Sequence, residues 1–154
     1  MLYSYIMQIY IDQSGKVEET EKPTILAFSN GKQKSIFISA KDKQEIQKLF
    51  REVGRPNVFI YKTFAILIFF LIKDELNEIQ SIIIDTEYIG YEPLIKNILI
   101  KLIRSKKKDF DSDSIHFQQV GKRHRCHEEA IRTFRREKRA DKIIKSGEVF
   151  QYVL

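Results

Sequence analysis

The sequence predicts a single α/β domain over residues 1–154, in which helices flank a mixed sheet of five strands. Short apolar runs of strand length alternate along the chain with longer runs whose apolar residues recur every three or four positions. An Asn30-Gly31 turn joins two of the short runs, which is typical of an antiparallel hairpin. With 154 residues, 43% of them hydrophobic and 31% charged, the chain has the composition of one domain with a buried core.

Three strands are predicted near the start of the chain. Residues 3–11 alternate and then run apolar into the turn-forming sequence Asp12-Gln13-Ser14-Gly15, so the first strand is expected to end at Asp12. Residues 24–28 and 34–38 form the two strands of the hairpin. The second and third strands are therefore expected to be antiparallel.

Three helices are predicted in the middle of the chain. After Ser39, apolar residues recur at helical spacing until Gly54 and Pro56 end the pattern. The apolar stretch within residues 57–74 is shorter than the roughly 20 residues that a membrane span needs, so we expect a buried helix and no membrane partner. Residues 92–104 form the third helix, with a proline in its first turn and a broad apolar face.

The second half of the chain adds two strands and one main helix. Residues 81–84 are a short β-branched run that ends at Asp85, and residues 115–120 follow a polar loop as the fifth strand. A helix is expected from about His124, with its apolar residues Ala130, Ile131 and Phe134 facing inward. The tail, residues 140–154, is interpreted as a short final helix or strand.

Several classes of protein are excluded. The single cysteine, Cys126, can form neither an internal disulfide nor a cysteine-rich zinc site, and this favours a reducing, cytoplasmic location. The first ten residues lack the basic region and cleavage site of a secretory signal. No phosphate-binding glycine loop, dinucleotide fingerprint or catalytic triad signature is present.

Two aspartates follow strands in a way that predicts a metal site. If the first, fourth and fifth strands run parallel, Asp12 and Asp85 emerge at the same edge of the sheet. Like charges so close together are costly unless a cation lies between them, and ligation by oxygen alone suits Mg²⁺ or Mn²⁺. Each aspartate taken singly also fits an ordinary turn or strand end; the metal hypothesis depends on the pair.

This order of elements and placement of acids resembles the ribonuclease H-like superfamily of nucleases, resolvases and transposases. The resemblance rests on YIDQSG at residues 10–15, IIDTE at residues 83–87 and GKRHRCHEEA at residues 121–130. It implies that Asp12 and Asp85 hold divalent ions. Ribonuclease H enzymes proper carry a further glutamate on the first helix, for which Glu45 is the nearest candidate and is not clearly aimed at the site.

The resemblance implies one further acid or histidine, and three residues compete for that place: Glu87, His127 and Glu128. His127 can act as a metal ligand or a proton shuttle, because helical spacing puts it in the first turn on the side of Ile131; His124 is its substitute if the helix starts earlier. Glu128 can instead simply pair with Arg132, four residues later. The predicted catalytic set is therefore Asp12, Asp85, Glu87, His127 and Glu128, with Asp12, Asp85 and His127 as metal ligands.

A basic segment, residues 122–142, holds nearly all of the excess charge of the protein. Nine lysines and arginines against four acids give it a net charge of +5, out of +6 for the whole chain. Such a surface binds phosphates, although a solvated basic helix is the simpler alternative. The predicted nucleic-acid contacts are Lys122, Arg123, Arg125, Arg132, Arg135 and Arg136.

Together these patterns predict a Mg²⁺- or Mn²⁺-dependent nuclease that hydrolyses phosphodiester bonds of RNA or DNA. The alternative is a module of the same fold that binds nucleic acid or a protein without catalysis, through its basic helix. Tyr88 and Tyr91 follow the second acid, where they can stack on a nucleobase or cover the edge of the sheet. The oligomeric state and the choice among RNA, DNA, a hybrid or a junction stay open.

Overall fold

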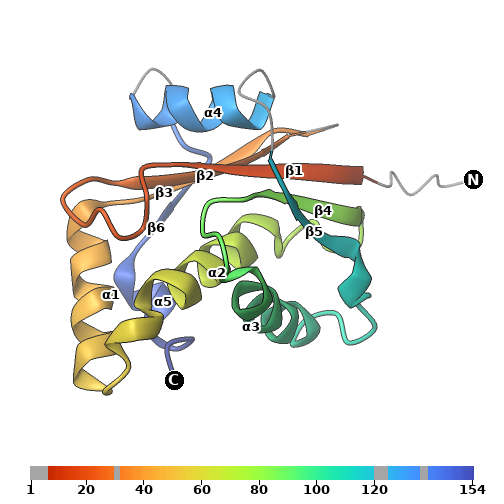
Figure 1. Ribbon diagram of the computed structural model, residues 1–154. Coiled ribbons are helices and arrows are strands. Elements are labelled where there is room, and N and C mark those ends of the chain that lie inside the picture. The colour runs from red at the N-terminus through yellow and green to blue at the C-terminus, as the bar shows by residue number, and fades with distance from the viewer. Residues whose placement is uncertain (1–6, 30–31, 120–124, 136–138) are drawn as a thin grey trace, which may run out of the picture.

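The computed structural model describes residues 7–29, 32–119, 125–135 and 139–154. The strands in these ranges form one mixed sheet in the order β5-β4-β1-β2-β3-β6 (Figure 1). Their bounds are β1 (Met7–Ser14), β2 (Thr24–Ser29), β3 (Lys34–Ile38), β4 (Ile79–Asp85), β5 (Ile115–Gln118) and β6 (Lys142–Ile144). The prediction of a mixed sheet flanked by helices is confirmed, but the prediction of five strands is wrong because the described residues form six.

The directions of the strands agree with the sequence. β2 and β3 are antiparallel neighbours, as the hairpin pattern predicts, and β1 also pairs with β2 in the antiparallel direction. β4 runs parallel to β1, and β5 runs parallel to β4. The carboxyl ends of β1, β4 and β5 therefore meet at one edge of the sheet, as the metal hypothesis requires.

The sixth strand, β6, pairs in parallel with β3. It spans three residues, which is too short for a periodic pattern to reveal. The side chain of Asp141, just before it, accepts a hydrogen bond from the backbone N–H of Ser35 on β3 at 2.8 Å. The predicted "short final helix or strand" is therefore both, since helix α5 (Ser146–Phe150) follows β6.

Helices cover both faces of the sheet. Figure 1 shows α1, α2, α3 and α5 on one side and α4 alone on the other. The main helices are α1 (Ala40–Glu52), α2 (Phe59–Ile72), α3 (Glu92–Arg104) and α4 (Arg125–Phe134), with short 3₁₀ helices η1 (Pro56–Val58) and η2 (Ser112–Ser114). α4 packs on β2, β1 and β3.

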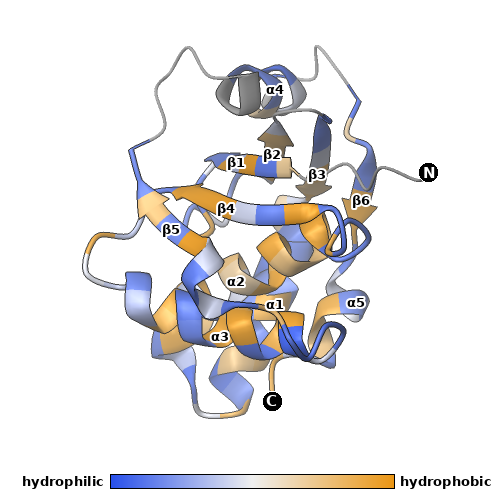
Figure 2. Cartoon of the chain, turned by 90° about the vertical axis from the view of Figure 1, so that its right-hand side faces the viewer, coloured by the Kyte–Doolittle hydropathy of each residue, from blue (hydrophilic) through white to orange (hydrophobic). Residues whose placement is uncertain are grey.

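The main core lies between the sheet and α2. Eleven of the fourteen residues of α2 are buried, which explains why this helix is apolar on all sides. Ile9 and Ile11 of β1 belong to the same core. In Figure 2 hydrophobic residues colour much of the helices below the sheet, whereas the described part of α4 is largely hydrophilic. None of the helices in the described ranges has the length and apolar character needed to span a membrane.

One strand end differs from the prediction in a way that matters for the site. β1 does not end at Asp12 but continues to Ser14, because its pairing with β2 extends to Ser14↔Ile25. Its pairing with β4 ends earlier, at Ile11↔Ile84. Beyond that point β1 is held by β2 on one side, and the acidic residues lie where β1 and β4 are no longer paired.

Candidate metal centre

Asp12 lies near the end of β1 and is buried, with 4% of its surface exposed. Side chains alternate between the faces of a strand, so Ile9 and Ile11 enter the main core while Tyr10 and Asp12 point to the face that α4 covers. The backbone N–H of Gln13 donates a hydrogen bond of 2.8 Å to Asp12 Oδ1. This contact fixes the orientation of a carboxylate that is otherwise costly to bury.

Asp85 ends β4 and reaches the same place from the neighbouring strand. Ile82 and Ile84 belong to the main core, so the alternation along β4 directs Ile83 and Asp85 to the opposite face. The backbone N–H of Thr86 donates to the carbonyl of Gln118 on β5 at 3.1 Å and so continues the contact between β4 and β5. The chain bends only from Tyr88, so Glu87, two residues after Asp85, lies on the same face as that aspartate.

The three carboxylates form a cluster that is suited to a divalent cation. Asp12, Asp85 and Glu87 each offer an oxygen atom, and these atoms lie within 4.8 Å of one another. Burial, hydrogen bonding to Asp85 and the charges of the two aspartates raise the pKa of Glu87 to about 8. Without a cation, the cluster therefore relieves its charge repulsion by holding a proton.

Of the other predicted members of the site, those whose side chains are described do not join this cluster. Glu128 lies on α4 with an exposed side chain. The side chain of His127 and the whole of His124 fall outside the described residues. Glu45 is exposed on α1 and accepts a hydrogen bond from the hydroxyl of Ser146 on α5, so it takes part in joining two helices. Of the three candidates for the further acid or histidine of the site, Glu87 is the residue that the structure describes beside Asp12 and Asp85.

Sequence reasoning missed Glu129. Its side chain is 4% exposed on α4, and Thr133, one turn later, is buried and donates through Oγ1 to the carbonyl of Glu129 at 2.9 Å. Ala130 packs on Ile25 and Ala27 of β2, whereas Ile131, expected to face inward, is only half-buried. The buried side chains among those described on α4 are thus an acid and small residues, and the signal that could have found them is the small size of Ala130 and Thr133.

The basic residues predicted to bind nucleic acid are partly described. Arg132 has an exposed side chain on α4, and Arg135 and Arg139, which follow the helix, are also exposed. Lys122, Arg123 and Arg136, together with the side chain of Arg125, fall outside the described residues. Because Glu129 and Thr133 occupy the sheet side of α4, Arg132 lies on its solvent side.

The tyrosines after the second acid have different environments. Tyr88 is 8% exposed and hydrogen-bonds through its hydroxyl to Gln13, next to Asp12, at 3.0 Å. Tyr91 is partly exposed and stacks on Tyr61 of α2, with ring centroids 3.9 Å apart. Burial, together with a hydrogen bond to Tyr91, raises the pKa of Tyr61 to about 12. Because Tyr88 is buried, it suits the predicted role of covering the edge of the sheet and not the role of stacking on a nucleobase.

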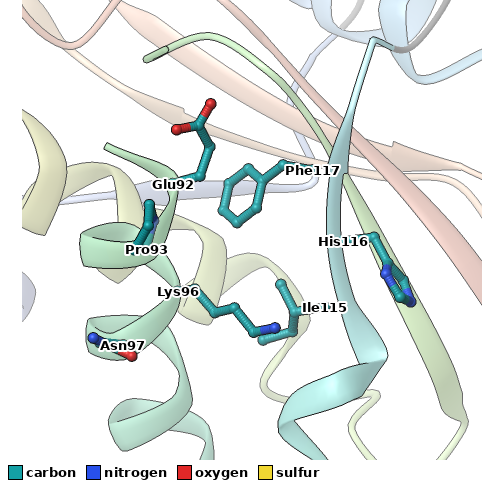
Figure 3. Close-up of a pocket in the computed structure, with 7 residues that line it drawn as sticks. All are labelled: Glu92, Pro93, Lys96, Asn97, Ile115, His116 and Phe117. Carbon is teal, nitrogen blue, oxygen red and sulfur yellow. The ribbon is translucent and has the colours of Figure 1, made fainter. Parts of the chain in front are cut away.

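A separate hollow of about 530 Å³ lies between α3 and the edge strand β5. Figure 3 shows Phe117 pointing toward α3, while His116 points to the other side of the strand. None of the three clustered carboxylates lines this hollow, so it is a feature distinct from the candidate metal centre.

Comparisons of the chain with models of protein families, with curated proteins and with solved structures found no match.

Proposed function

We propose that this protein is a metal-dependent nuclease that holds Mg²⁺ or Mn²⁺ on Asp12, Asp85 and Glu87 and hydrolyses phosphodiester bonds of nucleic acid. The observation that carries the proposal is the convergence of three carboxylates, with ligand atoms within 4.8 Å, at the carboxyl ends of two neighbouring parallel strands. The three acids are close in space although Asp12 precedes Asp85 by 73 residues in the sequence. Such an arrangement is costly without a cation, and this favours a functional role.

The donor set fits a hard divalent cation. It consists of oxygen atoms alone, which Mg²⁺ and Mn²⁺ prefer, and it includes none of the thiolate ligands that favour zinc. The raised pKa of Glu87 supports the same conclusion, because a cation would take over the charge neutralisation that a proton provides in its absence.

The resemblance to the ribonuclease H-like superfamily supports a nuclease over other metal enzymes. The two aspartates stand on the first and fourth strands, as the family pattern implies, and α4 packs on the face of the sheet to which they point. The family also implies an acid or histidine from the last main helix. His127, Glu128 and the buried Glu129 are the residues of α4 that can supply it.

The roles of the residues follow from this assignment. Asp12, Asp85 and Glu87 would hold a divalent ion, which when bound would supply activation of a water molecule and stabilisation of charge on the leaving oxygen. Asp12 and Asp85 are held by the paired strands, and the Gln13 N–H orients the Asp12 carboxylate. Arg132, on the solvent side of α4, and Arg135, directly after the helix, supply positive charge for the phosphate backbone of the substrate.

A second candidate function is a nucleic-acid-binding module without catalysis. The observation that favours it is the exposure of Arg132, Arg135 and Arg139, which leaves three cations facing solvent in one short segment. In that case nucleic acid would bind with a steep salt dependence and would not be cleaved.

Cleavage assays with an Asp12→Asn variant test the proposal. RNA, DNA, an RNA–DNA hybrid and a four-way junction would each be incubated with Mn²⁺ or Mg²⁺ and either the wild type or the variant. We expect the wild type to cleave at least one substrate and the variant to lose cleavage at least 100-fold while still binding that substrate. Cleavage that persists in the variant would exclude the assigned site, and binding without cleavage by the wild type would favour the second candidate.

A further inference from the structure

The hydroxyl of Tyr88 joins the two segments that carry the acids. It accepts hydrogen bonds from Gln13 Nε2 at 3.0 Å and from the backbone N–H of Val17 at 3.3 Å. It donates one hydrogen bond, to Glu18 Oε1, at 3.1 Å. A hydroxyl group has one hydrogen to donate and two lone pairs to accept with, so this network uses its full capacity.

These contacts lie where the sheet itself no longer ties the two segments together. The backbone pairing of β1 with β4 ends at Ile11↔Ile84. Gln13 directly follows Asp12, and Tyr88 directly follows Glu87. The hydrogen bond between Gln13 and Tyr88 therefore spans the gap between β1 and the loop after β4, one residue beyond each acid.

The ring of Tyr88 is anchored in the main core. It packs edge-on against Phe64, with centroids 5.1 Å apart, and against Tyr61, with centroids 5.8 Å apart. Both partners belong to α2, and Phe64 is 2% exposed. Because α2 is buried along most of its length, the position of the hydroxyl is set by the packing of the domain.

The loop that Tyr88 binds is fixed at a second point. The buried side chain of Lys43, on α1, donates through Nζ to the carbonyls of Lys16 and Glu19 at 3.0 and 2.7 Å. It also donates to Thr24 Oγ1 on β2 at 2.9 Å. The segment after β1 is thus held between Tyr88 and Lys43.

We propose that Tyr88 is a positioning residue of the metal centre: its hydroxyl, by binding Gln13, Val17 and Glu18, holds the loops after β1 and β4 at the spacing that lets Asp12 and Glu87 share a cation. The inference rests on the proposed function, since it assumes that the cluster binds a metal. The carboxylates that stay ionised in the absence of a cation repel one another, and the force acts to separate the two loops. Hydrogen bonds just outside a metal site resist such separation and typically raise the affinity of the site for its ion.

The test is the affinity of the full chain for Mn²⁺, measured by isothermal titration calorimetry. Tyr88→Phe removes the hydroxyl and keeps the ring in place against Phe64 and Tyr61. We expect the Kd for Mn²⁺ to rise about 10-fold to 100-fold, which is the usual effect of losing an outer hydrogen bond at a metal site. Circular dichroism would verify that each variant is folded at the temperature of the titration.

Tyr61→Phe is the matched control. Tyr61→Phe also removes only a hydroxyl from a ring on the same side of the sheet, and the hydrogen bond that this hydroxyl makes is with Tyr91. We expect its Kd for Mn²⁺ to equal that of the wild type. A purely structural role for Tyr88 would lower the melting temperature of the metal-free protein and leave the Kd unchanged.

Gln13→Met tests the same contact from the other side, and it serves if Tyr88→Phe fails to fold. We expect the Kd to rise in this variant too, and the double variant to bind Mn²⁺ no more weakly than the weaker single one, because both changes remove one interaction. Unchanged affinity in Tyr88→Phe and in Gln13→Met, with a wild type that binds Mn²⁺, would overturn the role of Tyr88 and leave the metal site intact. A wild type that binds no Mn²⁺ would overturn both.

Discussion

On the face of the sheet covered by α1, α2, α3 and α5, β1 presents Ile9 and Ile11 to a helix with eleven buried residues among fourteen. On the face covered by α4, the same strand presents Tyr10 and Asp12. The apolar core described on this second face is small, with Ile25 and Ala27 against Ala130. The comparison indicates that the two faces have different roles. Burial on the helix-rich face stabilises the domain, and this allows the other face to hold carboxylates that repel one another.

The largest expected effect is on the helix-rich face. Leu67 of α2 is fully buried, so Leu67→Ala leaves a cavity and should lower the free energy of unfolding by about 2 to 5 kcal/mol. At a temperature where this variant remains folded, its Kd for Mn²⁺ should match that of the wild type. Urea unfolding monitored by circular dichroism measures the first quantity. A loss of Mn²⁺ affinity comparable to the loss of stability would mean that the two faces are not separable.

The reverse pattern is expected for Asp85→Asn on the α4 face. At a free Mn²⁺ concentration of about 100 times the Kd, the ion should stabilise the wild type by roughly 2.7 kcal/mol. The variant should lose most of that stabilisation, while its metal-free stability should not fall, because one of the repelling charges of the cluster is removed. Thermal unfolding with and without Mn²⁺ gives both numbers. Equal stabilisation of the variant and the wild type would place the ion elsewhere.

Some of the residues on the α4 face could be predicted from the sequence and others could not. The proximity of Asp12 and Asp85 could be predicted because each aspartate lies near the end of a predicted strand, and parallel strands bring their carboxyl ends to one edge of the sheet. Glu87 could not be ranked above Glu128, because its place depends on how the chain continues beyond β4, where no periodic pattern extends. There the Thr86 N–H bonds to the Gln118 carbonyl on β5, a contact between distant segments.

The orientation of α4 was the harder case. Apolarity predicts that Ala130, Ile131 and Phe134 face the sheet. Ala130 is buried there as predicted, but Ile131 is only half-buried, the side chain of Phe134 lies outside the described residues, and Glu129 and Thr133 are buried instead. The rule that apolar residues face the sheet applies where the opposing surface is apolar, and here the strands present polar groups as well. Strand β6 could not be located within the predicted tail for another reason, because three residues are too few to show a periodic pattern.

The pH dependence of the metal-free protein should sharpen the comparison. The pKa of Glu87 is raised from 4.5 to about 8, so the folded state holds a proton that the unfolded state releases. The resulting stability is fully present below pH 4.5 and is lost as the pH rises through about 8. In the same range the affinity for Mn²⁺ should increase with pH, because the ion displaces the proton.

Glu87→Gln is the matched variant for this prediction. It cannot titrate, so its free energy of unfolding should change less between pH 5 and 8 than that of the wild type. Urea unfolding of both metal-free proteins at several pH values makes the measurement. Identical pH profiles would show that Glu87 does not carry the proton of the cluster.

The smallest expected effect concerns the solvent side of α4 and the residue directly after this helix. Replacing Arg132 and Arg135 together by alanine should weaken nucleic-acid binding and reduce the slope of log K against log salt by about 1.5 to 2. The control replaces two exposed cations on α1, Lys48 and Arg51, and should leave the slope unchanged. Fluorescence anisotropy at several salt concentrations compares the pairs. A slope that does not respond to the pair Arg132 and Arg135 would remove that segment from the binding surface.

The most direct test of the metal centre is anomalous scattering from a crystal soaked in Mn²⁺, since it requires no knowledge of the substrate. The predicted result is a peak at the carboxyl ends of β1 and β4, with oxygen atoms of Asp12, Asp85 and Glu87 as ligands. Additional ligation by Glu129, His127 or Glu128 would identify the contribution of α4. Mn²⁺ bound only elsewhere, with these three carboxylates left without an ion, would contradict the account.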